Sequence, residues 1–352
     1  MAKKTDYHVI VVGGSFAGLA VAMQLRGYRV LLVEQYPIGS HQMSACGTPV
    51  ATARAVGAEE AILEVHEHLV LHANGKAIPF SLRDPYVTFD YGAFCRAMLR
   101  QSDVELLQAR ATALSAHRVE TTRGSFTAGF VVNASGWRFR HQEAKVLGRS
   151  QEAFGYGLET ELPLLWTDPG LHFFFTKRFV NNGYAWIFPC GKTTRFGVGA
   201  FDKRVKLQGA LNAFLQDFGL EAGNTHGGVL AIARRQPVDE GVFLVGDAAG
   251  QCLPATGEGI RTAIFHGIHC GRAIAGALAG RLSRVEALRL YALQVQSMDQ
   301  FHRRLLTLQN LVAHTPEPLL ALAAQLCARP AFAQWIMDRY WLNSGWFLAR
   351  PA

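Results

Sequence analysis

The sequence has 352 residues, of which 49% are hydrophobic and 18% charged, values typical of a folded protein with a large core. Its formal charge of +8 is spread along the chain and no nucleic-acid-binding motif occurs, so we expect no nucleic-acid partner. No signal-peptide pattern and no run of 18 apolar residues is found, and the six scattered cysteines form no disulfide-rich spacing. These features predict a cytoplasmic protein with reduced thiols.

The chain begins with a strand–turn–helix–strand pattern. Tyr7–Val12 is apolar and β-branched, Ser15–Arg26 is helical in pattern, and Arg29–Glu34 is apolar again. Gly27 is well placed to end the helix. The pattern predicts one βαβ unit of an α/β protein, and therefore a parallel, Rossmann-like sheet covered on both faces.

The following regions predict a second, antiparallel layer. Val65–Leu71 and Lys76–Leu82 flank Asn74-Gly75, a strong hairpin signal. A second antiparallel series is predicted further along the chain, at Leu171–Lys177, Gly183–Phe188 and Thr193–Phe201. A buried strand follows at Gly241–Val245, and the chain from about Arg272 onward is mostly amphipathic helix.

The first strand is followed by GGSFAG, residues 13–18. Against a GxGxxG pattern, Gly13 and Gly18 match while Ser15 occupies the middle glycine position. Such a turn lets the backbone approach a pyrophosphate and directs helix N–H groups toward it. Glu34 ends the second strand, where a carboxylate can accept hydrogen bonds from ribose hydroxyls, and Gln35 follows it. We predict that these residues bind a dinucleotide.

A second glycine-rich segment, GVFLVGDAAG at 241–250, is followed by TGEGI at 256–260. It resembles the second FAD fingerprint of the flavoprotein group that includes aromatic hydroxylases and geranylgeranyl reductases. The resemblance implies that Asp247 binds the ribityl or pyrophosphate region of FAD. It also implies that the helix starting near Gly257, Gly259 and Ile260 directs its N–H groups at the flavin pyrimidine edge. FAD is therefore the predicted cofactor.

A third segment, VVNASG at 131–136, lies where this group usually carries an Ala-Asp-Gly strand end, with Ser135 replacing the aspartate. In the hydroxylases this aspartate serves both FAD and NADPH, so its loss argues against a hydroxylase. The segment YGAFC at 91–95 resembles the helix that normally offers Arg and Asp around a Phe. Tyr91 and Cys95 stand in their places, so the resemblance assigns no flavin contact to either residue.

The segment YAWIFP at 184–189, followed by GVG at 197–199, resembles the YxWxFP…GxG signature of geranylgeranyl reductases, although Asn181 replaces that family's upstream proline. Tyr184, Trp186 and Phe188 alternate and therefore share one strand face. They would either form an aromatic core stripe or line a site for an elongated apolar substrate. We predict the second.

The loop SACGTP at 44–49 matches a Cys-Gly that geranylgeranyl reductases carry beside the flavin ring. The resemblance implies that Cys46 contacts the substrate or helps to deliver a proton, while packing against the flavin is an equally strong alternative. Cys252 could approach the same ring, but a flavin-linked dithiol would normally have a closer spacing.

The resemblance runs from residue 6 to about 300 and implies an enzyme that transfers a hydride between flavin N5 and a C=C bond of a prenyl, lipid-like or polyketide-like substrate. No second GxGxxG is present, so NAD(P)H would bind transiently or an electron-donor protein would replace it. The alternatives are a flavin-dependent monooxygenase or halogenase acting on an aromatic substrate, for which Lys76 is a poor catalytic lysine, and a flavoprotein carrier.

The predicted division is an FAD-binding domain at 1–64, 83–145 and 240–285, a substrate domain at 65–82 and 146–239, and a helical segment at 286–352. His66, His68 and His72 share a strand face, but no acidic cluster accompanies them and we predict no metal. The tail could lie peripherally on a membrane, or it could cap a substrate tunnel or form a dimer interface. Its aromatic and basic residues are Trp335, Arg339, Tyr340, Trp341, Trp346, Phe347 and Arg350.

Overall fold

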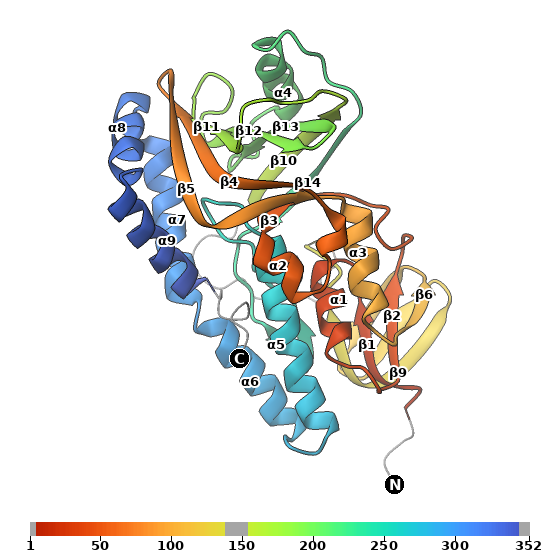
Figure 1. The fold of residues 1–352 in the computed structure, drawn as a ribbon. Coiled ribbons are helices and arrows are strands. Elements are labelled where there is room, and N and C mark those ends of the chain that lie inside the picture. The colour runs from red at the N-terminus through yellow and green to blue at the C-terminus, as the bar shows by residue number, and fades with distance from the viewer. Residues whose placement is uncertain (1–4, 138–153, 345–352) are drawn as a thin grey trace.

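The computed structural model describes residues 5–137 and 154–344 and contains two eight-stranded sheets with a helical C-terminal segment. Figure 1 shows the second sheet above the first, with the last helices running along one side of both. Tail residues Trp346, Phe347 and Arg350 lie outside the described residues. The predicted α/β class, with a parallel sheet and a separate antiparallel sheet, is confirmed.

The first sheet is the predicted Rossmann-like unit. Its order is β15-β16-β9-β1-β2-β6, with β16, β9, β1, β2 and β6 parallel, β15 antiparallel, and the β7–β8 hairpin attached to β9. The strands are β1 (Tyr7–Val12), β2 (Val30–Glu34), β6 (Glu105–Gln108), β7 (Ala111–Ser115), β8 (Arg118–Thr121), β9 (Gly124–Asn133), β15 (Val238–Asp239) and β16 (Val242–Leu244).

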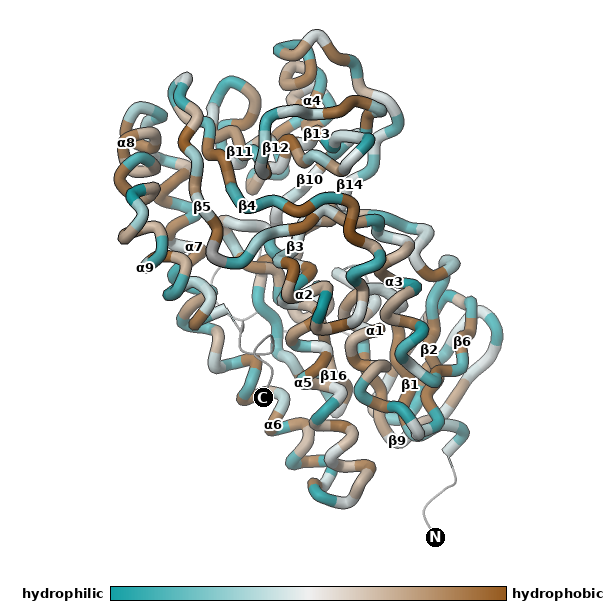
Figure 2. Tube along the Cα trace, viewed as in Figure 1, coloured by the Kyte–Doolittle hydropathy of each residue, from teal (hydrophilic) through white to brown (hydrophobic). Residues whose placement is uncertain are grey.

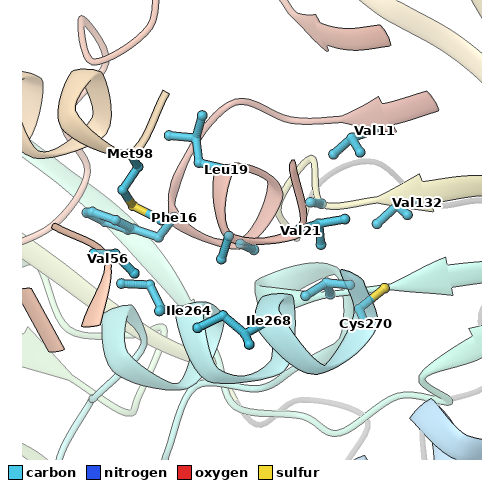
Figure 3. Close-up of a cluster of buried hydrophobic side chains, with 14 of the residues drawn as sticks. Val11, Phe16, Leu19, Val21, Val56, Met98, Val132, Ile264, Ile268 and Cys270 are labelled. Atoms are coloured by element: carbon cyan, nitrogen blue, oxygen red, sulfur yellow. The ribbon is translucent and has the colours of Figure 1, made fainter. Parts of the chain in front are cut away.

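Helices α1 (Phe16–Met23), α3 (Tyr91–Arg100) and α5 (Ile260–Leu278) belong to this unit, and α1 packs against both others. Figure 3 shows Phe16 and Leu19 of α1 among Met98, Ile264 and Ile268. The predicted helix ran three residues too far at its C-terminal end, because the backbone after α1 tightens into i→i+3 bonds before Gly27 adopts φ +81° and turns the chain toward β2.

The second sheet has the order β14-β10-β13-β12-β11-β4-β5-β3, antiparallel except between β4 and β11. Its strands are β3 (Gly47–Pro49), β4 (Ile62–Ala73), β5 (Lys76–Phe89), β10 (Phe154–Leu162), β11 (Leu171–Phe174), β12 (Gly183–Cys190), β13 (Thr193–Ala200) and β14 (Thr225–Ala231). Asn74 and Gly75 both have positive φ, as the predicted hairpin turn requires. The sheet takes in β3 and the end of β5 from residue 83 onward, which the domain division from sequence placed with the first sheet.

The two faces of β12 and β13 have different neighbours. Ala185, Ile187, Phe196 and Val198 pack toward α4 (Leu207–Gln216). The opposite face carries Tyr184, Trp186 and Phe188, as the alternation in the sequence predicts. This opposite face is the one that borders the cavity described below.

The helices after α5 link the two sheets. They are α6 (Arg284–Gln296), α7 (Asp299–His314), α8 (Glu317–Cys327) and α9 (Pro330–Asn343); α2 (Val50–Ala55) and the short η1 (Glu59–Ala61) lie near the start. α6 packs on α5, whereas α8 and α9 contact β4 and β5. Figure 2 shows apolar residues on these outer helices as well as inside the sheets. Among the described residues no single helix has the length and apolarity to cross a membrane; α8 and α9, bent by 92°, meet those criteria only as a pair.

Candidate functional site

A cavity of about 1050 Å³ extends from the strand ends of the first sheet to the aromatic face of the second. Its volume is at the upper end of the roughly 300–1,000 Å³ of small-molecule sites. Every predicted site residue except Gly18 lines it: Gly13, Ser15, Glu34, Gln35, Cys46, Tyr184, Trp186, Phe188, Asp247, Gly257, Gly259 and Ile260. One space therefore joins the predicted cofactor residues to the predicted substrate residues.

Gly13 and Gly18 shape the turn between β1 and α1. Gly13 has φ +109°, and a Cβ there would lie 2.2 Å from the carbonyl oxygen of Ala134. A Cβ on Gly18 would lie 1.9 Å from the carbonyl oxygen of Gly13. Gly18 thus holds the helix against the turn, whereas Gly13 and Ser15 present their backbone to the cavity.

Glu34 is held at the cavity edge by two backbone donors. Its Oε2 accepts from the Gly14 N–H at 2.7 Å and its Oε1 from the Tyr36 N–H at 3.0 Å. Each carboxylate oxygen can accept a second hydrogen bond. The arrangement fits a ribose with vicinal hydroxyls, which is the group that we predicted from the sequence as the partner of Glu34.

Tyr91 lies in the cavity wall, although the sequence gave no reason to expect a contact there. Its hydroxyl lies 3.0 Å from the Ser15 hydroxyl, and together they cover the start of α1. Cys95, one helical turn later, is buried in the core, and burial raises its pKa to about 12. Of the two residues that depart from the family pattern, one contributes to the cavity and the other to packing.

The middle segment places Ala134, Ser135 and Gly136 in the cavity wall. The Ser135 hydroxyl donates to Asn133 Oδ1 at 2.6 Å, and the Ser135 N–H donates to the same atom at 3.2 Å. The position that carries an acid in the related flavoproteins is therefore small, uncharged and turned toward its own strand end.

Asp247 sits in a short turn, Gly246–Ala249, that follows β16. Its low-polarity surroundings raise the pKa of its carboxyl to about 6, and the Arg235 guanidinium opposes that rise. The turn is braced because the Gly246 N–H donates to Gln251 Oε1 at 2.7 Å. A carboxylate in such a place gains most from hydroxyl donors such as those of a ribityl chain.

Glu258, which precedes α5, joins the cavity to the C-terminal helices. Its carboxylate accepts hydrogen bonds from Tyr86, Tyr340 and Arg261. Burial alone would raise the pKa of Glu258, but Arg261 and the two hydroxyls outweigh it and lower that pKa. Arg261 also donates to the Ser344 carbonyl at 2.6 Å and lies over the Trp341 ring. Sequence reasoning did not single out this network.

The indole of Trp186 lies across neighbouring glycines of the second sheet. A Cβ on Gly197 would be 2.1 Å from the indole, and one on Gly199 would be 3.2 Å away. The absence of side chains at Gly197 and Gly199 lets the indole N–H reach β10, where it donates to Glu159 Oε2 at 2.6 Å. The tryptophan and the GxG of the reductase signature therefore form one physical unit.

Cys46 borders the same wall in an unusual backbone conformation, with φ 55°. Its thiol donates to the Ser44 carbonyl at 3.2 Å, and burial raises its pKa well above the ordinary value although Arg195 lies nearby. Arg195 fixes the loop by donating to the Ala45 and Phe89 carbonyls, both at 3.2 Å. The Cys46 side chain is thus a neutral thiol at neutral pH and not a thiolate nucleophile.

Glu159 and His226 were not identified from the sequence. Both line the cavity, and His226 Nε2 lies 3.0 Å from Glu159 Oε1. They come from β10 and β14, far apart in sequence but directly opposite in the sheet. Only the strand register reveals the pair.

His66 and His72, which the sequence predicted on one strand face, have different partners in the structure. His66 is buried with its Nε2 3.3 Å from Thr88 Oγ1, and His72 pairs with His172 at 3.0 Å. No group of three metal-ligating side chains occurs in the described parts of the chain. Cys252, by contrast, is buried and lines the cavity.

No family model matches the chain. Among curated proteins, digeranylgeranylglycerophospholipid reductase 3 of Methanosphaera stadtmanae is 32% identical over 164 residues, which is 40% of this chain and 41% of that protein. Digeranylgeranylglycerophospholipid reductase 2 of Methanopyrus kandleri is 29% identical over 310 residues, which is 78% of this chain and 77% of that protein. The match thus spans about two fifths of the Methanosphaera protein and about three quarters of the Methanopyrus protein.

Solved structures share the fold. A geranylgeranyl bacteriochlorophyll reductase-like protein of Thermoplasma acidophilum superposes with a TM-score of 0.81 at 18% identity, covering 94% of this chain and 98% of its own. A flavin-dependent brominase superposes with a TM-score of 0.73 at 16% identity, covering 96% and 93%. By its curated relatives and by its fold, the chain resembles the geranylgeranyl reductase-like group of FAD-dependent oxidoreductases.

Proposed function

We propose that the chain is an FAD-dependent oxidoreductase that transfers a hydride between the flavin and a C=C bond of an apolar, prenyl- or lipid-like substrate. One observation carries the proposal: a single cavity joins a dinucleotide-type strand end to a buried aromatic wall with a neutral thiol beside it. The similarity to digeranylgeranylglycerophospholipid reductases supports the same class of substrate.

The residues that would hold FAD come from the first sheet. Glu34 would accept from the ribose, the backbone of Gly13 and Ser15 would face the pyrophosphate, and Asp247 would accept from the ribityl chain. The backbone N–H groups of Gly259 and Ile260 lie at the start of α5, where the helix dipole favours negative charge on a reduced ring. Bound there, FAD would supply the hydride.

The second sheet would bind the substrate. Tyr184, Trp186 and Phe188 are fixed by hydrogen bonds at their polar ends or by packing, so they would offer a rigid apolar surface. Cys46 would contact the substrate as a neutral thiol. The reducing equivalents would come from transiently bound NAD(P)H or from an electron-donor protein.

An anaerobic experiment tests the reaction. FAD-loaded protein is reduced with dithionite or NADPH, and digeranylgeranylglycerophospholipid is added without oxygen. We expect the oxidised flavin spectrum to return and the lipid to gain two hydrogens per double bond. If the reduced flavin does not react with the lipid but yields an oxygenated or halogenated aromatic product once oxygen, halide and an aromatic substrate are added, the monooxygenase or halogenase class, our second candidate, is established instead.

We further propose that α8 and α9 lie against an anionic membrane from which such a substrate would enter. Leu319, Leu322 and Trp335 are each more than half exposed, and Trp335 stacks on Phe332. Arg339 lies over the Trp335 ring, and the chain carries a formal charge of +8. Apolar side chains beside cations suit an anionic lipid surface.

Vesicle flotation tests this contact. Protein should float with anionic vesicles more than with neutral ones, and Leu322→Glu should abolish flotation while Leu165→Glu, an equally apolar and exposed position outside these helices, should not. Flotation that is unchanged in Leu322→Glu, together with a change in its oligomeric state by light scattering, would identify the surface as a subunit interface instead.

A further inference from the structure

Glu159 and His226 form a carboxylate–imidazole pair in the cavity wall. The two residues are direct cross-strand partners of β10 and β14, with the imidazole Nε2 3.0 Å from the carboxylate. The Glu159 side chain is 3% exposed and that of His226 is 27% exposed. The imidazole is thus the accessible end of the pair, and the carboxylate lies behind it.

Both carboxylate oxygens of Glu159 have a hydrogen-bond partner. Oε1 accepts from His226, and Oε2 accepts from the Trp186 indole N–H at 2.6 Å. The carboxylate is therefore locked between a titratable ring and an aromatic ring that borders the same cavity. A carboxylate held against one nitrogen of an imidazole fixes the orientation of the ring.

The other groups around His226 are few. Gln42 Nε2 lies 3.1 Å from His226 Nε2. Glu161, also on β10, lies close enough to feel the charge of His226. Burial raises the pKa of Glu161, but hydrogen bonds from Thr193 and Arg195 and the nearby His226 together lower it. Arg195 of β13 pairs with Glu161 at 2.8 Å. Arg195 is therefore neutralised by Glu161, while His226 pairs directly with Glu159.

We infer that His226 is the proton donor of the cavity and that Glu159 is its positioning residue. The inference rests on the proposed function and deepens it. Saturating a C=C bond forms two C–H bonds, one with the hydride that the reduced flavin supplies and one with a proton. The proton leaves the His226 imidazolium, and the neutral imidazole recovers it from water through its exposed edge.

Two other donors in the wall, the Cys46 thiol and the Tyr184 phenol, are poorer acids. Burial raises the pKa of the Cys46 thiol and of the Tyr184 phenol far above neutrality. Histidine is the side chain whose ordinary titration falls between about pH 5 and 8, so it can both give and regain a proton under physiological conditions. A purely structural alternative is that Glu159 and His226 only hold the Trp186 indole in place.

Three variants separate these roles. His226→Gln keeps an N–H donor for Glu159 but cannot titrate, Glu159→Gln removes the charge behind the ring, and His314→Gln makes the same change as the first at an exposed position on α7. Each reduced protein is mixed anaerobically with digeranylgeranylglycerophospholipid from pH 5 to 9. Lipid binding to the oxidised protein is measured in parallel.

In the wild type and His314→Gln we expect flavin reoxidation to slow as pH rises, because the imidazolium is the donor. His226→Gln should be slower by roughly 100-fold or more and should lose this pH dependence, while lipid binding changes little. The reoxidation rate of Glu159→Gln should lie between those of the wild type and His226→Gln. Equal rates and pH profiles in His226→Gln and the wild type, or a loss confined to lipid binding, would overturn the inference.

A readout without turnover completes the test. The Trp186 contribution to fluorescence, taken as the difference from Trp186→Phe, should change with pH in the wild type and not in His226→Gln, because Glu159 links the indole to the imidazole. A wild type that the lipid does not reoxidise would defeat the proposed reaction. A fluorescence change that persists in His226→Gln would defeat the role of His226 independently of that result.

Discussion

The two sheets build their parts of the cavity by different means. The first sheet contributes strand ends, where the backbone of Gly13 and single carboxylates such as Glu34 face the cavity, and the start of α5 adds the backbone of Gly259. The second sheet contributes a face, covered by aromatic rings and the Glu159–His226 pair. A strand end needs a short contiguous motif, whereas a face needs residues from several strands in register.

The largest expected effect on the first sheet is that of Gly18→Ala. Its Cβ would lie 1.9 Å from the Gly13 carbonyl oxygen, and neither backbone segment can give way cheaply. We expect a loss of about 3 kcal/mol or more in the free energy of unfolding, together with loss of FAD. Gly209→Ala is the matched control, since Gly209 is an exposed position of α4 with open space around it and the change should add about 0.5–1 kcal/mol. Chemical denaturation measures both, and similar effects would contradict the close-packing role of Gly18.

Asp247→Asn tests a charge at the strand end of the first sheet. The carboxyl has a pKa of about 6 in the folded protein against an ordinary value of 3.8, so folding favours its neutral form. This stabilisation is complete below about pH 4 and is lost as pH rises through 6, a difference of roughly 2–3 kcal/mol. The FAD-free variant should therefore be more stable than the wild type at pH 7 but not at pH 4. Parallel Tm profiles of the two proteins would show the expectation to be wrong.

Glu34→Ala tests the predicted ribose contact. Loss of the carboxylate should weaken FAD binding by roughly 1–3 kcal/mol, because ribose hydroxyls lose their acceptor. Glu64→Ala is a matched control: its carboxylate also caps a backbone N–H, that of Gly191 at 2.7 Å, but it does not line the cavity. Titration of the FAD-free proteins with FAD should separate them, and equal retention of FAD in both variants would remove Glu34 from the site.

The smallest expected effect belongs to the second sheet. Gly197→Ala would place a methyl group 2.1 Å from the Trp186 indole, whereas in Gly157→Ala the nearest indole atom is 3.6 Å away. Gly197→Ala should shift the tryptophan fluorescence and slow lipid-dependent flavin oxidation by about tenfold, near 1.4 kcal/mol in the barrier. FAD affinity should be unchanged in both. If Gly197→Ala released FAD as well, the two sheets would not divide their tasks as described.

Sequence reasoning recovered the parts of the site that are local in the chain. Residues 13–18, Glu34 and the start of α5 are recognisable because the turn, the strand end and the helix start are adjacent in sequence. Alternation alone also placed Tyr184, Trp186 and Phe188 on one face. Their position in the cavity wall, and not only in the core, needed the structure.

Residues brought together by register or by tertiary packing were missed. Glu159 and His226 meet only because β10 and β14 are aligned at that position. Glu258 gains its partners from β5 and α9, and Tyr91 reaches Ser15 across the α1–α3 contact. No pattern within a short window encodes such pairings, since each depends on how strands and helices are placed relative to one another.

The Glu258 hydrogen-bond network constrains which segments of this chain can be exchanged with those of a related protein. Its carboxylate is shared by Arg261 at the start of α5, Tyr86 in the second sheet and Tyr340 in α9. A tail exchanged from a related protein would leave a buried acid and a buried guanidinium short of partners unless positions 258 and 261 changed with it. We therefore expect the C-terminal helices and α5 to be exchangeable between relatives only as one block.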